Sequence, residues 1–198
     1  GGITDRIIHF CMALIGHVRG GLGLANVGSS MVFAGISGTA ISDTVSIGSV
    51  MIPAMIKRGY DAEFSAAVTA SSSTVGPIIP PSLPMVIAGT VTGLSVSRLF
   101  VAGIIPGLLL GFGLGIVSYL ISVKRNHPKE DRLPFREVVR SFFSAFWAIL
   151  MTLIILGGIM GGFFTPTEAA MIAVFYALIV GFFVYGELKL AALPKIIF

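Results

Sequence analysis

Two polar stretches interrupt long apolar sequence between residues 35 and 84. The first reads GISGTAISD and the second reads TASSSTVGPIIPPSLP, so hydroxyl side chains, glycines, prolines and one acid stand together. Their hydroxyl oxygens, and the carbonyl oxygens freed where Gly and Pro break a helix, are hard ligands of the kind that sodium takes. Asp43 could add negative charge to such a site. This pattern predicts a site for a small cation.

Hydrolysis is the alternative chemistry, because Ser37 and Ser42 stand close to Asp43. However, the string GISG lacks the G-x-S-x-G spacing of a nucleophile elbow, and the three histidines stand outside both stretches. No general base therefore accompanies the serines. We expect no catalytic residues and no metal other than sodium. A structural reading also stands, in which the small residues serve only close helix packing.

The composition is that of a membrane protein. Of 198 residues, 55% are hydrophobic and 11% are charged, whereas a soluble domain has about 25% charged residues. The formal net charge is +4, but seven of the thirteen Lys and Arg residues flank apolar runs. They are Lys57, Arg58, Lys124, Arg125, Lys129, Arg132 and Arg136. Charge in these places sets membrane topology and argues against a nucleic-acid partner. The single cysteine excludes a disulfide within the chain.

The first polar stretch lies in a long apolar run at residues 22–58. The run is too long for one membrane span, which needs about 20 residues, and too short for two spans with a loop. Basic residues flank both of its ends, so the positive-inside rule places both ends in the cytoplasm. We predict a re-entrant helical hairpin with its tip at 37–39, whose second half is capped by Ser42 or Asp43.

The second polar stretch lies in residues 59–92, which we predict to be a broken transmembrane helix. Pro77, Pro80 and Pro81 each lack a backbone donor and crowd the preceding turn, so the helix cannot be continuous there. We expect it to be unwound over residues 74–82. Its unwound part can then meet the hairpin tip inside the membrane.

The remaining elements follow from hydropathy and charge. We expect an interfacial or juxtamembrane helix at 1–21, transmembrane helices at 93–123, 145–164 and 165–186, a solvated cytoplasmic loop with an amphipathic arm helix at 124–144, and the start of a second arm at 187–198. Gly103, Gly107, Gly111 and Gly115 recur every four residues and predict a face for close packing. Thr165 and Glu168 have the spacing of a helix-capping box.

Four segments of the sequence resemble the large membrane subunit of tripartite ATP-independent periplasmic (TRAP) transporters, in the dicarboxylate and sialic acid branch. They are GISGTAISDTVSIGSVMIPAM, GPIIPPSLPMVI, SRLFVAGIIPGLL and GGFFTPTEAA. The resemblance implies an all-α polytopic membrane protein with an elevator-type ion-transporter-like fold, containing a re-entrant helical hairpin and a discontinuous transmembrane helix. It implies sodium-coupled transport of an organic acid across the bacterial inner membrane. It also implies that this chain is an internal piece of a longer subunit.

The resemblance further implies partners and site residues. The partners are a small TRAP membrane subunit, a periplasmic substrate-binding protein, membrane lipids and the organic acid, with sodium as coupling ion and no other cofactor. Sodium would bind at Ser37, Gly38, Thr39, Asp43, Thr74, Gly76 and Pro80. Substrate, either sialic acid or a C4-dicarboxylate, would contact Thr39, Pro81 and Ser82. The alternative function is that of a membrane scaffold or assembly subunit that does not transport.

Overall fold

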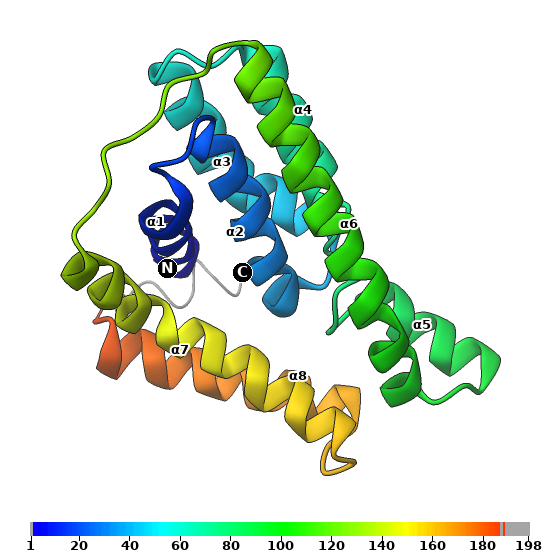
Figure 1. The fold of residues 1–198 in the computed structure, drawn as a ribbon. Helices are drawn as coiled ribbons and strands as arrows, with labels where there is room; N and C mark the ends of the chain where they lie inside the picture. The colour runs from blue at the N-terminus through cyan, green and yellow to red at the C-terminus, as the bar shows by residue number, and fades with distance from the viewer. Residues whose placement is uncertain (1, 187, 189–198) are drawn as a thin grey trace.

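The computed structural model describes residues 2–186 and 188, and every regular element in that part of the chain is a helix (Figure 1). The second arm expected at 187–198 lies outside the described residues, apart from residue 188. Three of the described helices are long and apolar enough to cross a membrane: Val96–Lys124, Phe135–Met160 and Pro166–Val184. These elements agree with the membrane protein expected from the composition and with the all-α architecture that the resemblance implies.

The N-terminal helix α1 (Ile3–Ile15) is amphipathic and buries Ile7, Ile8 and Cys11. It packs against both α2 and α7, so it connects two parts of the molecule. A short turn over residues 16–20 follows, and Gly20 adopts a positive φ of 72° where the next helix begins.

A helical hairpin follows, made of α2 (Gly21–Ser37) and α3 (Ala40–Lys57). Only Gly38 and Thr39 separate the two helices, and Gly38 has φ 62°, which a residue with a side chain rarely adopts. The predicted cap was wrong. The cap is Thr39 and not Ser42 or Asp43, because the Thr39 hydroxyl accepts a hydrogen bond from the backbone amide of Ser42 (3.3 Å). Helix α3 therefore begins earlier than the sequence suggested.

The next helix is broken where the prolines predicted a break. Helix α4 (Ala62–Ser73) ends before Thr74, and α5 (Leu83–Thr92) begins after Ser82, whose hydroxyl accepts from Met85 N at 3.3 Å. The segment between them contains a cis Pro80–Pro81 peptide bond. Helix α4 packs against both halves of the hairpin, so the break is held next to the hairpin tip.

The long helix α6 (Val96–Lys124) runs beside α4 and α5 (Figure 1). Its spaced glycines allow this approach. A Cβ atom on Gly107 would lie 2.5 Å from Ile79 Cγ1, and one on Gly103 would lie 2.5 Å from the carbonyl oxygen of Ile78. Gly103 and Gly107 thus fit against the unwound segment of the broken helix, whereas Gly111 and Gly115 lie against Met31 and Leu24 of α2.

The loop after α6 packs against the base of the hairpin. His127 is only 5% exposed, and its ring lies against Tyr60 and Phe64, with centroid separations of 4.4 and 4.7 Å. The backbone amide of Glu130 donates to the carbonyl of Gly16 (3.1 Å), and Arg58 pairs with Glu130 (2.6 Å). Most of the loop is exposed, as expected of a solvated loop, but aromatic side chains at the hairpin base cover His127.

The last helices are α7 (Phe135–Met160) and α8 (Pro166–Ile179), which continues into a π-helical turn, η1 (Val180–Val184). The two helices lie side by side (Figure 1). The arm and the span expected as separate elements form one continuous helix, α7, since no Gly or Pro occurs between 135 and 156 to interrupt it. The capping box at the start of α8 is present, with Thr165 N donating to Glu168 Oε2 at 2.7 Å.

Buried apolar residues form two clusters. The larger one joins α1, the hairpin and α4, with Ile47, Met51 and Met55 fully buried. The smaller one joins Phe100 of α6 to the C-terminal half of α7 and to α8. The hairpin tip and the break of the α4–α5 helix lie where these two clusters approach each other.

Candidate functional site

The hairpin tip and the break of the α4–α5 helix are in direct contact. The backbone amide of Leu83 donates a hydrogen bond to the carbonyl oxygen of Gly38 (3.2 Å). A Cβ atom on Gly76 would lie 3.2 Å from the carbonyl group of Thr39, and one on Gly38 would lie 2.6 Å from the carbonyl oxygen of Pro81. The fold therefore brings together three predicted sodium ligands, Gly38, Thr39 and Gly76, and the predicted substrate residue Pro81.

Backbone oxygens are concentrated at this contact. The Thr39 carbonyl accepts from Asp43 N at 3.3 Å and from the Ser37 hydroxyl at 3.4 Å. Pro80, in the segment between α4 and α5, is fully buried. The Thr74 side chain, by contrast, is exposed and its hydroxyl donates to the Ser71 carbonyl at 2.6 Å. Any contribution of Thr74 to a cation at the tip would come through its backbone.

Asp43 lies deeper than the tip, on the face of α3 that packs against α2 and α4. Its side chain is completely buried, and neither carboxylate oxygen has a hydrogen-bond partner among the described residues. The hydroxyls of Ser30 and Ser73 lie close enough to interact with its charge. Burial of an unpaired carboxylate costs several kcal/mol of folding free energy. Binding of a cation or a proton at Asp43 would therefore stabilise the folded protein.

A chain of buried polar side chains extends from Asp43 between α2 and α4. The hydroxyls of Ser30 and Ser72 lie 3.0 Å apart, and Asn26 Nδ2 donates to Thr69 Oγ1 at 2.7 Å. Both pairs are fully buried, while Asn26 Oδ1 and Ser29 Oγ have no partner in the described part of the chain. Sequence reasoning missed this group. The only sequence signal was the pair of serine runs, at 29–30 and 71–73.

A cavity of about 300 Å³ lies on the other side of the tip. Two of the three predicted substrate residues, Pro81 and Ser82, line it together with Ser37 and Gly38. Its opposite wall is apolar and comes from α6, α7 and α8. Thr39, the third predicted substrate residue, does not line it. The Ser82 hydroxyl is already engaged, since it donates to the Pro77 carbonyl at 2.6 Å and accepts from Met85 N.

Carboxylates, imidazoles and thiols do not gather into a metal centre. Within residues 2–186, no group of three or more His, Cys, Asp and Glu side chains is placed to hold a metal ion. The ligands available at the tip are backbone carbonyls, hydroxyls and one carboxylate, which suit a hard monovalent cation. The polar groups thus lie on one side of the tip, and the cavity of about 300 Å³ lies on the other.

Known proteins resemble the chain along its full length. The family model described as the tripartite ATP-independent periplasmic transporter, DctM component, matches residues 1–198. The sialic acid TRAP transporter permease protein SiaT of Haemophilus influenzae is 44% identical over 193 residues, 98% of this chain and 31% of the relative. The C4-dicarboxylate TRAP transporter large permease protein DctM of Pseudomonas aeruginosa is 42% identical over 197 residues, 100% of this chain and 46% of the relative.

A third relative, the sialic acid TRAP transporter large permease protein SiaM of Vibrio cholerae, is 42% identical over 196 residues, 99% of this chain and 46% of its own length. The chain thus spans less than half the length of these curated relatives. The match covers every helix from α1 to α8, including the hairpin and the broken helix. The chain belongs to the DctM component family of tripartite ATP-independent periplasmic transporters.

Proposed function

We propose that this chain contributes one cation site and part of a solute site to a sodium-coupled transporter of a small organic acid. The observation that carries this proposal is the contact between Gly38 and Leu83, which joins two interrupted helical elements next to a buried, uncompensated carboxylate. Breaks of this kind in apolar helices provide carbonyl ligands for a cation. Membership of the family supports the same function.

In the proposed site, sodium is held between the hairpin tip and the unwound segment. The tip residues Ser37, Gly38 and Thr39 and the break residues Gly76 and Pro80 would supply backbone carbonyl ligands, and the Thr39 carbonyl lies against Gly76. Asp43 adds negative charge from the buried side. Because the carboxylate is shielded from water, its attraction for a cation is stronger than that of a surface carboxylate.

The solute occupies the cavity beside the tip in this proposal. Pro81 and Ser82 form the polar part of its wall, and the N-terminus of α5, which begins after Ser82, directs its positive dipole end toward this region. Such a site suits a carboxylate. SiaT is named for sialic acid and DctM for C4-dicarboxylate, and we extend both to this chain as candidates.

Transport proceeds in this proposal by an elevator motion in the bacterial inner membrane. The buried cluster of the hairpin and α4 forms one body and the cluster of α7 and α8 forms another, with the solute cavity between them. Displacement of the first body along the second would carry both ligands across. By the family name, a periplasmic component belongs to the system. We propose a small membrane subunit and a periplasmic binding protein as partners, and no enzymatic activity.

Uptake by proteoliposomes tests the proposal. The natural full-length protein, reconstituted with its small membrane subunit, is supplied with its binding protein and a radiolabelled organic acid. We expect uptake with an inward sodium gradient and loss of uptake when potassium replaces sodium. Equal uptake in potassium would overturn sodium coupling, and no uptake of any organic acid would favour the scaffold function.

A matched pair of threonine variants locates the site. Thr39→Ala removes the hydroxyl that caps α3 at the tip, whereas Thr92→Ala removes an exposed hydroxyl that donates to the Ala88 carbonyl at the far end of α5. We expect at least about a tenfold loss of apparent sodium affinity for Thr39→Ala, rescue by Thr39→Ser, which keeps the cap, and no change for Thr92→Ala. Equal affinities in all three variants would exclude the Thr39 side chain from the cation site.

A further inference from the structure

Four hydroxyl side chains of α4 form a buried stripe that faces the hairpin. They are Ser65, Thr69, Ser72 and Ser73, and each is completely shielded from solvent. Their spacing of three or four residues places them on one side of the helix, over about 12 Å of its length. The Ser73 hydroxyl lies beside Asp43, and at the other end the Ser65 hydroxyl donates to the Asp61 carbonyl (2.8 Å), where α4 begins. The stripe therefore extends from the proposed cation site to the base of the hairpin.

Close helix packing explains most of these hydroxyls. Thr69 Oγ1 donates to the Ser65 carbonyl and Ser73 Oγ donates to the Thr69 carbonyl, both at 2.8 Å. Small side chains whose hydroxyls are satisfied by their own helix let two helices approach each other inside a membrane. The stripe therefore requires no ligand by itself.

Asn26 of α2 is not explained by packing. Its side chain is completely buried, and its Nδ2 donates to Thr69 Oγ1 (2.7 Å), so the amide points into the stripe. Its Oδ1 has no hydrogen-bond partner among the described residues. An amide is larger than the side chains that close packing selects, and burial of its unpaired oxygen is unfavourable. Water or a cation would give this oxygen the partner that it lacks.

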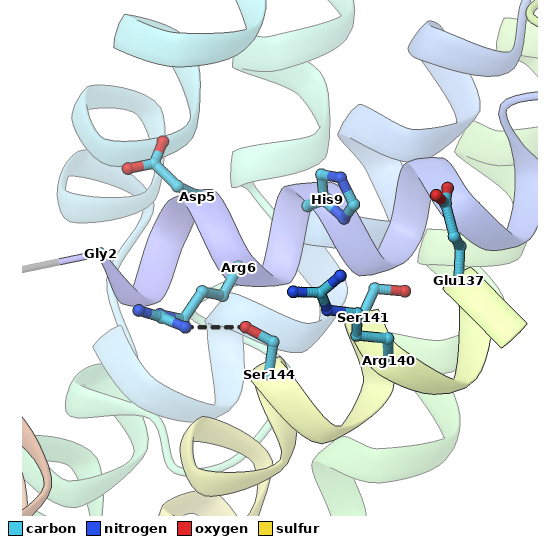
Figure 2. A pocket seen from close by; sticks show the side chains of 8 residues that line it. All are labelled: Gly2, Asp5, Arg6, His9, Glu137, Arg140, Ser141 and Ser144. Atoms are coloured by element: carbon cyan, nitrogen blue, oxygen red, sulfur yellow. Dashed lines mark hydrogen bonds between the residues drawn. The ribbon is translucent and has the colours of Figure 1, made fainter. Parts of the chain in front are cut away.

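The polar cavity between α1 and the first turns of α7 differs in this respect (Figure 2). Its volume is about 490 Å³, larger than that of the cavity beside the tip. The Arg6 guanidinium donates to the Ser144 hydroxyl there (2.8 Å), and the side chains of Asp5, His9 and Glu137 are exposed. Exposed charges are stabilised by solvent, so this cavity requires no ligand. The Asn26 oxygen is shielded from solvent and does require a partner.

The polar side chains of α2 connect Asn26 to Asp43. Ser30 stands four residues after Asn26 and therefore on the same side of α2. The Ser30 hydroxyl lies close enough to interact with Asp43 and is 3.0 Å from the Ser72 hydroxyl. Neither α2 nor α4 contains a basic residue. A cation at this interface would therefore meet oxygen atoms and no positive side chain from either helix.

We propose that the polar side chains between α2 and α4 form a hydrated passage by which the cation leaves Asp43 toward the base of the hairpin. Water bound to Asn26 Oδ1 hydrates the cation once it has left the carboxylate. The contact between Ser30 and Ser72 closes the passage until these two small side chains separate. This inference rests on the cation site of the proposed function, and it adds a route of release that does not require the tip to open.

Radiolytic labelling tests the hydration of this passage. An X-ray pulse converts bound water into hydroxyl radicals, which oxidise a neighbouring methionine to its sulfoxide. Met55 is fully buried with its Sδ 3.6 Å from Asn26 Nδ2, whereas Met151 is 6% exposed and belongs to the apolar cluster of α7 and α8. In the natural full-length protein, we expect Met55 to be oxidised at least about tenfold faster than Met151. Equal rates for the two methionines would overturn the hydrated passage.

Two substitutions of Asn26 separate a passage from a packing role. Asn26→Leu fills the position with an apolar side chain, whereas Asn26→Ser keeps an oxygen and leaves room for water. We expect Asn26→Leu to abolish the rapid oxidation of Met55 and to slow sodium-driven uptake by proteoliposomes at least about tenfold, while the sodium concentration for half-maximal thermal stabilisation changes less than about twofold. Asn26→Ser should keep both rapid oxidation and uptake. A packing role predicts the reverse order, because serine leaves a cavity.

The outcomes also separate the passage from the proposed function. Uptake as fast in Asn26→Leu as in the wild type, or slower in Asn26→Ser than in Asn26→Leu, would overturn the passage. A loss of sodium affinity in Asn26→Leu as large as the loss of uptake would make Asn26 a ligand of the first site and would also overturn the passage. Slow oxidation of Met55 with intact uptake would overturn the passage alone, whereas a wild type without sodium-driven uptake would overturn the proposed function and the passage with it.

Discussion

Gly38 and Leu83 are joined by a backbone hydrogen bond, with the Leu83 amide 3.2 Å from the Gly38 carbonyl oxygen. Each residue stands at an interruption of helix, one between α2 and α3 and the other at the start of α5. Interrupted backbone needs partners wherever water is absent, and here each break supplies a partner to the other. The two breaks therefore stabilise each other, and a substitution that displaces one should also displace the other.

The first prediction concerns the backbone conformation at the tip. Gly38→Ala should lower the stability of the protein, because φ is +62° and the added Cβ would lie 2.6 Å from the Pro81 carbonyl oxygen. The left-handed conformation alone costs about 1–2 kcal/mol. Gly59→Ala is a matched control, with φ +87° and no atom within 4 Å of its Cβ. Thermal unfolding should show a larger loss for Gly38→Ala, and only this variant should weaken sodium binding. Equal losses would mean that the contact with Pro81 has no effect.

The second prediction concerns the buried carboxylate. Asp43→Asn should raise the thermal unfolding temperature in sodium-free buffer, because it removes a fully buried charge without a hydrogen-bond partner among the described residues. A bound ion at 100 times its Kd stabilises the folded state by about 2.7 kcal/mol, and most of this sodium effect should vanish in the variant. Asp131→Asn, at an exposed loop position, should change neither value. Full retention of the sodium effect by Asp43→Asn would exclude Asp43 from the site.

The third prediction concerns the packing of α6 on the break. Gly107→Ala should destabilise the protein by about 1–3 kcal/mol, since its Cβ would lie 2.5 Å from Ile79 Cγ1 and 3.3 Å from the Ile79 amide. Gly113 is on the same helix, and its Cβ would meet no atom within 4 Å. Gly113→Ala should therefore be neutral or stabilising by up to about 1 kcal/mol. Denaturation in detergent micelles compares the two, and equal stabilities would contradict the packing.

The fourth prediction concerns the pH dependence of the Asp61–Arg125 ion pair. The Arg125 guanidinium donates to Asp61 at 2.6 Å and holds the pKa of that carboxyl below its ordinary value. The folded pKa lies below the unfolded one, so the stabilisation is fully present above the unfolded pKa and is lost as the pH falls through the folded pKa. Unfolding temperatures should fall below about pH 4, and Asp61→Asn should flatten this fall. Glu63→Gln, an exposed acid nearby, serves as control, and a pH profile unchanged by Asp61→Asn would contradict the role of the pair.

Much of the fold was predictable because its determinants are local. The prolines at 77, 80 and 81 end α4 and delay α5, and Thr165 with Glu168 caps α8, by interactions between residues close in sequence. The capping of α3 was harder, since Thr39, Ser42 and Asp43 are all good capping residues and only the backbone of the tip selects Thr39.

The buried group around Asp43 could not be derived in the same way. The link between Asn26 and Thr69, and that between Ser30 and Ser72, depend on which faces of α2 and α4 meet. That choice is made by tertiary packing of helices whose surfaces are apolar on several sides, so periodicity does not reveal it. The cavity beside the tip likewise needs α7 and α8, which are distant in sequence.

The loop that packs on the hairpin base also constrains how the molecule can bend. Residues 127–130 are attached to the hairpin side by the Tyr60 hydroxyl, which donates to the Pro128 carbonyl at 3.2 Å, and by the Arg58–Glu130 ion pair. In the elevator motion that we propose, the C-terminal end of α6 would travel with the hairpin. Helix α7 begins at Phe135, so the non-helical residues 131–134 would act as the hinge, and their length would limit how far the hairpin can be displaced.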